Sequence, residues 1–122
     1  MSGIKTYREL EVWKKSLDLV KLVYATTGCF PEKEIFSLTN QMRRAAVSVP
    51  SNIAEGFRRR HGKEHKQFLN IALGSCAELE TQIFISKKLP KTIKLDYNKV
   101  DSLLEEVMKM LNKLISQLEP KA

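Results

Sequence analysis

Apolar residues recur every three or four positions along most of the chain, which is the spacing of one face of an α-helix. The pattern predicts four helices at about 7–27, 34–60, 63–89 and 96–118, punctuated by Gly28 with Pro31, by Gly62 and by Pro90. No segment shows the alternation that is typical of a β-strand. Long helices with short connections favour an all-α fold, an antiparallel up-down four-helix bundle, which we expect to be one domain over residues 1–122.

The same spacing predicts which residues face the core. In the first helix these are Leu10, Trp13, Leu17, Val20 and Tyr24. In the second they are Leu38, Met42, Ala45 or Ala46, Val49, Ile53, and Gly56 or Phe57. In the fourth, with Asp96 as the expected N-cap, they are Val100, Leu104, Val107, Leu111, Leu114 and Leu118. The fourth helix is the most regular, because its apolar steps alternate between four and three.

Pro50 interrupts the second helical segment. Proline has no N–H to donate to the carbonyl of Ala46, and its ring crowds the preceding turn. The helix therefore either kinks there or stops at Val49, with a new helix that has Pro50 in its first turn. Because the apolar stripe stays in phase from Val49 to Ile53, we expect one helix, kinked at Pro50.

The third helix is apolar over about half of its circumference, whereas a surface helix needs little more than 100° to face one core. This breadth predicts contact with two neighbours, inside the bundle or across a subunit interface. Gly74 costs a helix interior about 1 kcal/mol relative to alanine, so we expect a packing reason for it. Glu80 projects into the apolar sector, between the directions of Leu69 and Leu73, so it is either exposed at a seam or paired. We expect a structural ion pair, with Arg43 or Arg44 as the partner.

A polar stripe runs beside the apolar face of the second helix. It consists of Arg44, Ser48, Asn52, Glu55 and Arg59. Two interpretations stay open: a solvated face with local ion pairs, or a seam packed against a neighbouring helix or subunit, where buried polar groups need partners. The candidate structural seam is Arg44, Asn52, Glu55 and Glu80.

The net charge of the chain gives information on its binding partners. The chain has 21 basic and 14 acidic residues, a net charge of +7, which favours polyanions such as RNA or DNA or an acidic protein surface. The charge concentrates between the second and third helices, where Glu64 is the one acid among five cations. The candidate nucleic-acid contacts are Arg58, Arg59, Arg60, Lys63 and Lys66, with Arg43 and Arg44 as further candidates. The alternative is a solvated charged turn.

Catalytic, metal and cofactor patterns are missing from the sequence. His61 and His65 are four residues apart, but two histidines without a third ligand make a poor zinc site, and we expect them to be solvated. No phosphate-binding glycine loop or nucleophile–base pair is recognisable, so we expect no enzyme, no cofactor and no small-molecule substrate. Cys29 and Cys76 read as free, buried thiols. With no signal peptide and no membrane-spanning run, the expected compartment is a reducing cytoplasm.

Three segments, YRELEVWKKSLDLV, QMRRAAVSVPSNIAEGFRR and FLNIALGSCAELETQ, resemble a known family. It comprises the four-helix-bundle proteins encoded by intervening sequences in bacterial 23S ribosomal RNA genes, also called S23 ribosomal proteins. The resemblance covers about residues 7–118 and extends to the related accessory proteins of diversity-generating retroelements. It implies an antiparallel four-helix bundle, assembly into a homopentamer and no established catalytic activity.

The retroelement relatives use a basic pentamer to bind a reverse transcriptase and nucleic acid, and this chain shares the basic character. The resemblance thus implies a non-enzymatic homo-oligomer whose basic surface contacts RNA or a nucleic-acid–protein assembly. The alternative is a protein-interaction or scaffold module that does not bind nucleic acid directly.

Overall fold

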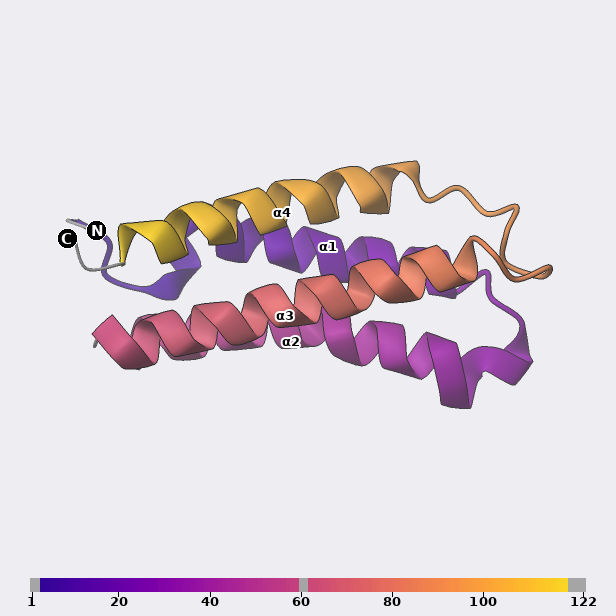
Figure 1. Ribbon diagram of the computed structural model, residues 1–122, viewed down its shortest axis with the longest axis horizontal. Coiled ribbons are helices and arrows are strands. Elements are labelled where there is room, and N and C mark those ends of the chain that lie inside the picture. Colours follow the sequence, from indigo (N-terminus) through magenta and orange to yellow (C-terminus); the bar gives the residue numbers. More distant parts are fainter. Residues whose placement is uncertain (1–2, 60–61, 119–122) are drawn as a thin grey trace.

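Four long helices form an antiparallel bundle in the computed structural model, which describes residues 3–59 and 62–118 (Figure 1). In chain order the described elements are η1 (Tyr7–Glu9), α1 (Glu11–Thr27), η2 (Glu32–Glu34), η3 (Ile35–Thr39), α2 (Asn40–Arg59), α3 (Gly62–Ser86) and α4 (Asn98–Gln117). Both α1 and α3 contact α2 and α4, so the helices close a ring around one core. Successive helices run in opposite directions, and connections 28–39 and 87–97 lie at the same end (Figure 1). The predicted all-α four-helix fold is confirmed.

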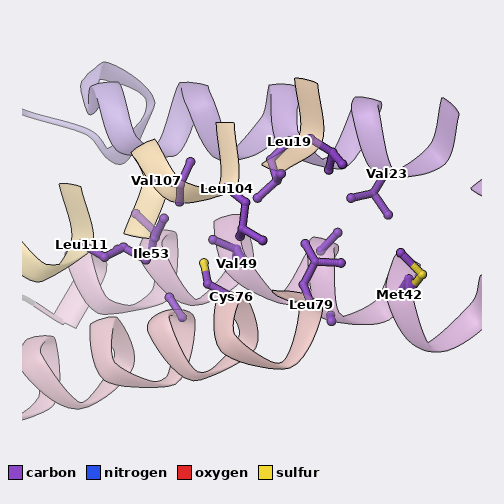
Figure 2. Packing of buried hydrophobic residues seen from close by; sticks show 14 of the residues in the cluster. Leu19, Val23, Met42, Val49, Ile53, Cys76, Leu79, Leu104, Val107 and Leu111 are labelled. Atoms are coloured by element: carbon purple, nitrogen blue, oxygen red, sulfur yellow. The ribbon is translucent and has the colours of Figure 1, made fainter. Parts of the chain in front are cut away.

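Each long helix contributes side chains to the shared core (Figure 2). The central residues are Leu19 and Val23 from α1, Met42, Val49 and Ile53 from α2, Cys76 and Leu79 from α3, and Leu104, Val107 and Leu111 from α4. All of them are at most 2% exposed. Since burying one such aliphatic side chain stabilises a fold by about 1.5–3 kcal/mol, this core is the main source of stability.

Helix α2 continues through Pro50 without a break, and the proline itself is buried. The alternative of a helix that stops at Val49 is therefore wrong, while a bend at Pro50 stays a prediction. The predicted core face of this segment is confirmed, because its buried residues are Leu38, Met42, Ala45, Ala46, Val49, Ile53, Gly56 and Phe57.

Helix α1 buries a face that only partly overlaps the predicted one. Leu10, just before the helix, is buried as predicted, and Trp13 and Val20 are partly buried against the core. Its buried residues are Val12, Ser16, Leu19, Val23 and Thr27. The predicted core residues Leu17 and Tyr24 are instead 39% and 44% exposed, so that part of the prediction is wrong. Ser16 and Thr27 can lie inside because their hydroxyls donate to the carbonyls of Trp13 and Val23, each at 2.7 Å. The prediction from sequence spacing favoured the larger apolar residues. It did not take into account that a serine or threonine hydroxyl can be buried when it bonds to a carbonyl of its own helix.

The α3–α4 connection is longer than predicted. Helix α3 ends at Ser86 instead of Leu89, and α4 begins at Asn98. The N-cap position of α4 is Tyr97, yet the Asp96 carboxylate still accepts the N–H of Asn98 at 2.9 Å. Asp96 therefore performs a capping role from one residue earlier than the N-cap. The core face of α4 agrees with the prediction at Val100, Leu104, Val107 and Leu111, with Ile115 continuing it.

Helix α3 buries one side of its broad apolar sector and leaves the rest uncovered. Leu69, Ala72, Cys76, Leu79 and Ile83 are buried. Outside this face, Phe84 is 57% exposed, and Ile71 and Ile85 are also exposed. Within the described residues, no helix combines the length and the apolarity that a bilayer crossing requires.

Candidate functional site

The predicted nucleic-acid contacts gather where α2 ends and α3 begins. Arg58, Arg59 and Lys63 are exposed there, and Lys66 is partly exposed. Among the described residues, neither Arg58 nor Lys63 forms an ion pair. Arg60 lies outside the described residues. We call Arg58, Arg59, Lys63 and Lys66 the basic end of the bundle.

Arg59 is already partly neutralised within the chain. Its Nε and Nη2 atoms lie 3.1 and 2.9 Å from Oε1 of Glu55, one helical turn earlier. Its guanidinium also lies over the Phe68 ring, 5.6 Å from the ring centre. An exposed pair of this kind stabilises a helix by only about 0.3–0.5 kcal/mol, so a phosphate could compete for the guanidinium.

Arg43 and Arg44 do not belong to the basic end. They precede Arg59 by about four turns of α2, a separation of roughly 20 Å along the helix. Arg43 joins α2 to α1: its Nε donates to Oγ1 of Thr27 at 2.9 Å, and its guanidinium stacks 4.4 Å from the centre of the Tyr24 ring. Tyr24 therefore lies outside the core and packs against the Arg43 guanidinium, and Arg43 has a structural role in joining α1 and α2.

His65 is buried, contrary to the expected solvated histidine. Its ring meets Phe57 edge-on, with 6.4 Å between the ring centres. Burial lowers the pKa of His65 below its ordinary value, because the charged imidazolium loses its hydration. The described residues contain no group of three His, Cys, Asp or Glu side chains that could hold a metal ion, and His61 lies outside them.

The polar stripe of α2 divides into a seam and a surface. Ser48 and Asn52 are partly buried against α3: the Oγ atoms of Ser48 and Ser75 are 2.8 Å apart, and Nδ2 of Asn52 donates to O and Oγ of Ser48 at 2.8 and 2.9 Å. Glu55 has its partner on the surface in Arg59. These hydroxyls bond to hydroxyl, amide and carbonyl groups, and none of those is a general base that could activate a serine.

The expected ion pair of Glu80 is not formed. Glu80 is exposed, and among the described residues it forms no ion pair, while Arg43 bonds to Thr27 instead. The helical-wheel prediction placed Glu80 between Leu69 and Leu73, but that edge of α3 faces solvent in a single chain. Nearby Cys76 is buried, which raises the pKa of its thiol to about 12, so it is not a reactive nucleophile. Cys29 is exposed, contrary to the prediction of a buried thiol.

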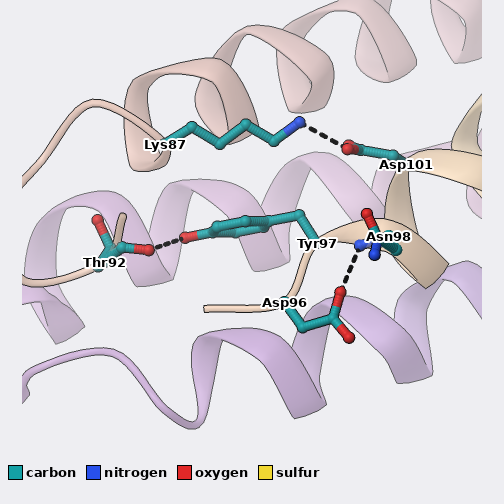
Figure 3. Close-up of polar contacts among 6 residues, drawn as sticks. All are labelled: Lys87, Thr92, Asp96, Tyr97, Asn98 and Asp101. Carbon is teal, nitrogen blue, oxygen red and sulfur yellow. Dashed lines mark hydrogen bonds and ion pairs between the residues drawn. The ribbon is translucent and has the colours of Figure 1, made fainter. Parts of the chain in front are cut away.

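A second group of cations, which the sequence analysis missed, lies in the α3–α4 connection. Lys88, Lys91 and Lys94 are all exposed. The connection is held in place by Thr92, whose Oγ1 donates to the carbonyl of Ser86 at 2.7 Å. The carbonyl of Thr92 accepts from the Tyr97 hydroxyl, also at 2.7 Å (Figure 3). The sequence could have revealed this group, because residues 87–94 contain four lysines and no acid. Their net charge of +4 equals that of residues 58–66, which contain the predicted nucleic-acid contacts.

The first lysine of that run has a local partner. Lys87 donates to Asp101 at 2.6 Å and so ties the end of α3 to the first turn of α4 (Figure 3). The nearby Asp96 carboxylate is engaged with the Asn98 N–H. The two acids nearest in sequence to this connection are therefore engaged, and among the described residues Lys88, Lys91 and Lys94 form no ion pair. We call these three residues the loop lysines.

A polar groove of about 500 Å³ lies between α2 and α3. We call it the α2–α3 groove; its lining residues are Gln41, Arg44, Ala45, Ser48, Glu78 and Gln82. The Gln82 side chain is buried, and its Oε1 has no hydrogen-bond partner in the described chain. A buried polar atom without a partner costs about 1–3 kcal/mol, so Gln82 carries an uncompensated cost within the described chain.

Comparison with known proteins agrees with the architecture. No curated protein matches the chain significantly. The model of one family, described as 23S rRNA-intervening sequence protein, matches residues 8–113. That span contains α1, α2 and α3 entire, with the basic end, the polar stripe and the α2–α3 groove. The chain therefore belongs to the 23S rRNA-intervening sequence protein family.

Proposed function

We propose that this protein is a non-enzymatic, cytoplasmic bundle that assembles with copies of itself, as a pentamer, and contacts RNA or an RNA–protein assembly through its basic end. The observation that carries the RNA contact is the meeting of Arg58 and Lys63, which form no ion pair with any described residue, at the adjoining ends of two helices. Such a surface binds the phosphate backbone with little regard to sequence.

Self-association is supported by what one chain leaves uncovered. Phe84, Ile71 and Ile85 are exposed on α3, and the breadth of its apolar sector exceeds what the bundle buries. Contiguous exposed apolar surface marks protein contacts, and we place the contact between copies on the part of this sector that the bundle leaves uncovered. Native mass spectrometry should give a mass that is a multiple of the chain mass, five-fold for the pentamer. A monomer at high concentration contradicts this part of the proposal.

Filter binding with labelled RNA tests the RNA contact. If about four phosphates are contacted, the association constant should fall by about two orders of magnitude between 50 and 200 mM salt, because each contact releases condensed counterions. Absence of RNA binding even at low salt would remove the proposal.

A scaffold that binds protein and no nucleic acid is the second candidate. It is favoured by the internal use of two predicted cations, Arg59 with Glu55 and Arg43 with Thr27. Changing Arg58, Arg59 and Arg60 together to Glu separates the two functions. If RNA is the partner, binding should be lost while the oligomer survives. If the protein is a scaffold, the unchanged protein should already bind no RNA, and the variant should still assemble.

A further inference from the structure

Phe36 is the most exposed large apolar side chain among the described residues. Its exposed fraction is 93%, whereas the other exposed large apolar side chains lie between 39% and 57%. Phe36 belongs to η3, whose buried residues are Leu38 and Thr39, so this turn packs on the bundle through them and leaves the ring outside. A ring this exposed adds little to the stability of the fold, because almost none of its apolar surface is removed from water.

The two faces of the Phe36 ring are free. Every other described phenylalanine, tyrosine or tryptophan is buried or lies against a second ring or a cation. Phe36 has neither kind of contact among the described residues. A planar group of a partner can therefore stack on it without displacing any side chain of the protein.

The loop lysines lie at the same end of the bundle as Phe36. The connections 28–39 and 87–97, which contain them, meet this end side of the four helices (Figure 1). The loop lysines are exposed and form no ion pair among the described residues. In the connection of Phe36, by contrast, Glu32 and Glu34 outnumber Lys33. A phosphate at this end is therefore attracted to the loop lysines and not to the residues next to the ring.

An exposed aromatic ring and exposed lysines at one end of a protein match the chemistry of single-stranded nucleic acid. In sites for single strands, cations follow the phosphates and unpaired bases stack on aromatic rings. A base inside an RNA duplex is already paired and stacked, so it reaches a side chain only after it has been pulled out of the helix. The ring therefore favours unpaired RNA, whereas lysines alone bind both forms.

From these observations we infer that the end of the bundle formed by connections 28–39 and 87–97 is a site for single-stranded RNA. One unpaired base stacks on Phe36, and the loop lysines bind the adjoining phosphates. The inference rests on the proposed RNA contact and adds to it a second contact and the class of RNA. It also gives the two ends of the bundle different roles, because the basic end binds phosphates alone.

Phe36→Leu tests the stacking, because it keeps an apolar side chain and removes the ring. Binding of a labelled oligouridine of about twelve nucleotides should weaken by about fivefold or more, since base stacking on an aromatic ring contributes that much to affinity. Phe36→Trp, which keeps a ring, should bind as the wild type does. Because the side chain makes few contacts in the chain, the circular dichroism spectrum and the oligomer mass should not change.

Two controls separate stacking from other effects. Ile93→Ala removes an apolar side chain that is 50% exposed at the same end, and it should change oligouridine binding little, because an aliphatic side chain has no π-face. An RNA duplex of about twelve base pairs should bind the wild type and Phe36→Leu equally well.

The salt dependence distinguishes the ring from the lysines. Stacking releases no counterions, so Phe36→Leu should lower the affinity for oligouridine at every salt concentration and leave the slope of log affinity against log salt unchanged. Changing the three loop lysines together to Gln should instead make that slope shallower.

The outcomes also separate the inference from the function on which it rests. If Phe36→Leu binds oligouridine as tightly as the wild type, the inference is overturned while the RNA contact at the basic end stands. An equal loss of duplex binding overturns it too, and so does a changed oligomer mass, which would assign the ring to a contact between copies. A wild-type protein that binds no RNA at low salt overturns both.

Discussion

At the residue scale, several polar side chains that reach the interior of the bundle have specific partners, whereas Oγ1 of Thr39 and Oε1 of Gln82 have none among the described residues. Thr27 joins its own helix to Arg43 of the next, and Ser48 joins Asn52 to Ser75. His65 is different, because it is buried against the aromatic ring of Phe57 and its pKa is lowered. The stability of the fold should therefore depend on the protonation of this one imidazole.

The direction of that dependence follows from the two states. In the unfolded chain His65 has a pKa of about 6.5, and in the folded chain its pKa is lower. The unfolded state therefore binds more protons as the pH falls below about 6.5, so the stability present above that pH is lost as the pH drops through the folded pKa. Thermal melts at pH 7.5 and 5.5 should show a decrease in Tm.

His65→Gln serves as the control for this prediction. The variant keeps His61 and every carboxylate, so the difference between its two melts should be smaller than in the wild type. Equal differences in both proteins would mean that His65 does not carry the pH dependence.

At the element scale, the contact between α2 and α3 depends on a close backbone approach at Gly56. A Cβ on this residue would lie 3.0 Å from the Cβ of Phe68 and 3.2 Å from the His65 carbonyl oxygen. Neither of those atoms is the end of a flexible side chain, so the helices themselves would have to separate. This close approach brings the start of α3, with Lys63 and Lys66, beside the end of α2.

Gly56→Val should therefore destabilise the fold by about 2 kcal/mol or more, as overpacking does in a rigid site. Urea unfolding at a fixed protein concentration measures the loss. Ser51→Val, on the exposed side of the same helix, adds the same type of side chain and should change the free energy of unfolding by no more than about 0.5 kcal/mol. Similar losses in both variants would point to helix propensity as the cause.

At the scale of the whole molecule, positive charge collects at both ends of the bundle. The basic end and the loop lysines lie at the two ends of α3, about 37 Å apart for a 25-residue helix. A nucleic acid that contacts both groups must run the length of the bundle. If binding depended only on the net charge of the protein, every exposed lysine would contribute equally to the affinity. The effect of where the charges lie on RNA affinity can thus be distinguished from the effect of the total net charge.

Two triple variants of equal charge make that separation. Lys88, Lys91 and Lys94 changed to Gln should reduce the slope of log affinity against log salt by about 2 for a long RNA, since each phosphate contact contributes about 0.7–0.9. Lys14, Lys109 and Lys113 changed to Gln remove the same charge from α1 and α4 and should change the slope less. Equal effects would assign the binding to net charge.

The accuracy of the sequence-based predictions differs between the helices. Helical spacing predicted the four helices, and the core faces of α2 and α4 agree because each has one dominant apolar stripe. In α1 two stripes compete, and the buried one includes Ser16 and Thr27, whose hydroxyls bond to their own helix. Arg58, Arg59, Lys63 and Lys66 lie together, whereas Arg43 and Arg44 lie about four turns away along α2. That any of these cations contacts nucleic acid stays a prediction.

The sequence by itself therefore determined the all-α class, the approximate helix bounds, the family and the positive charge, since these depend on local spacing and composition. Only the tertiary structure decided which face of α1 is inside, that His65 is buried, that Glu80 is exposed and that Gly56 is crowded while Gly74 is open. The physical reason is that burial and partnership depend on the neighbouring helix, and a helix's own periodicity carries no information on which neighbour it meets.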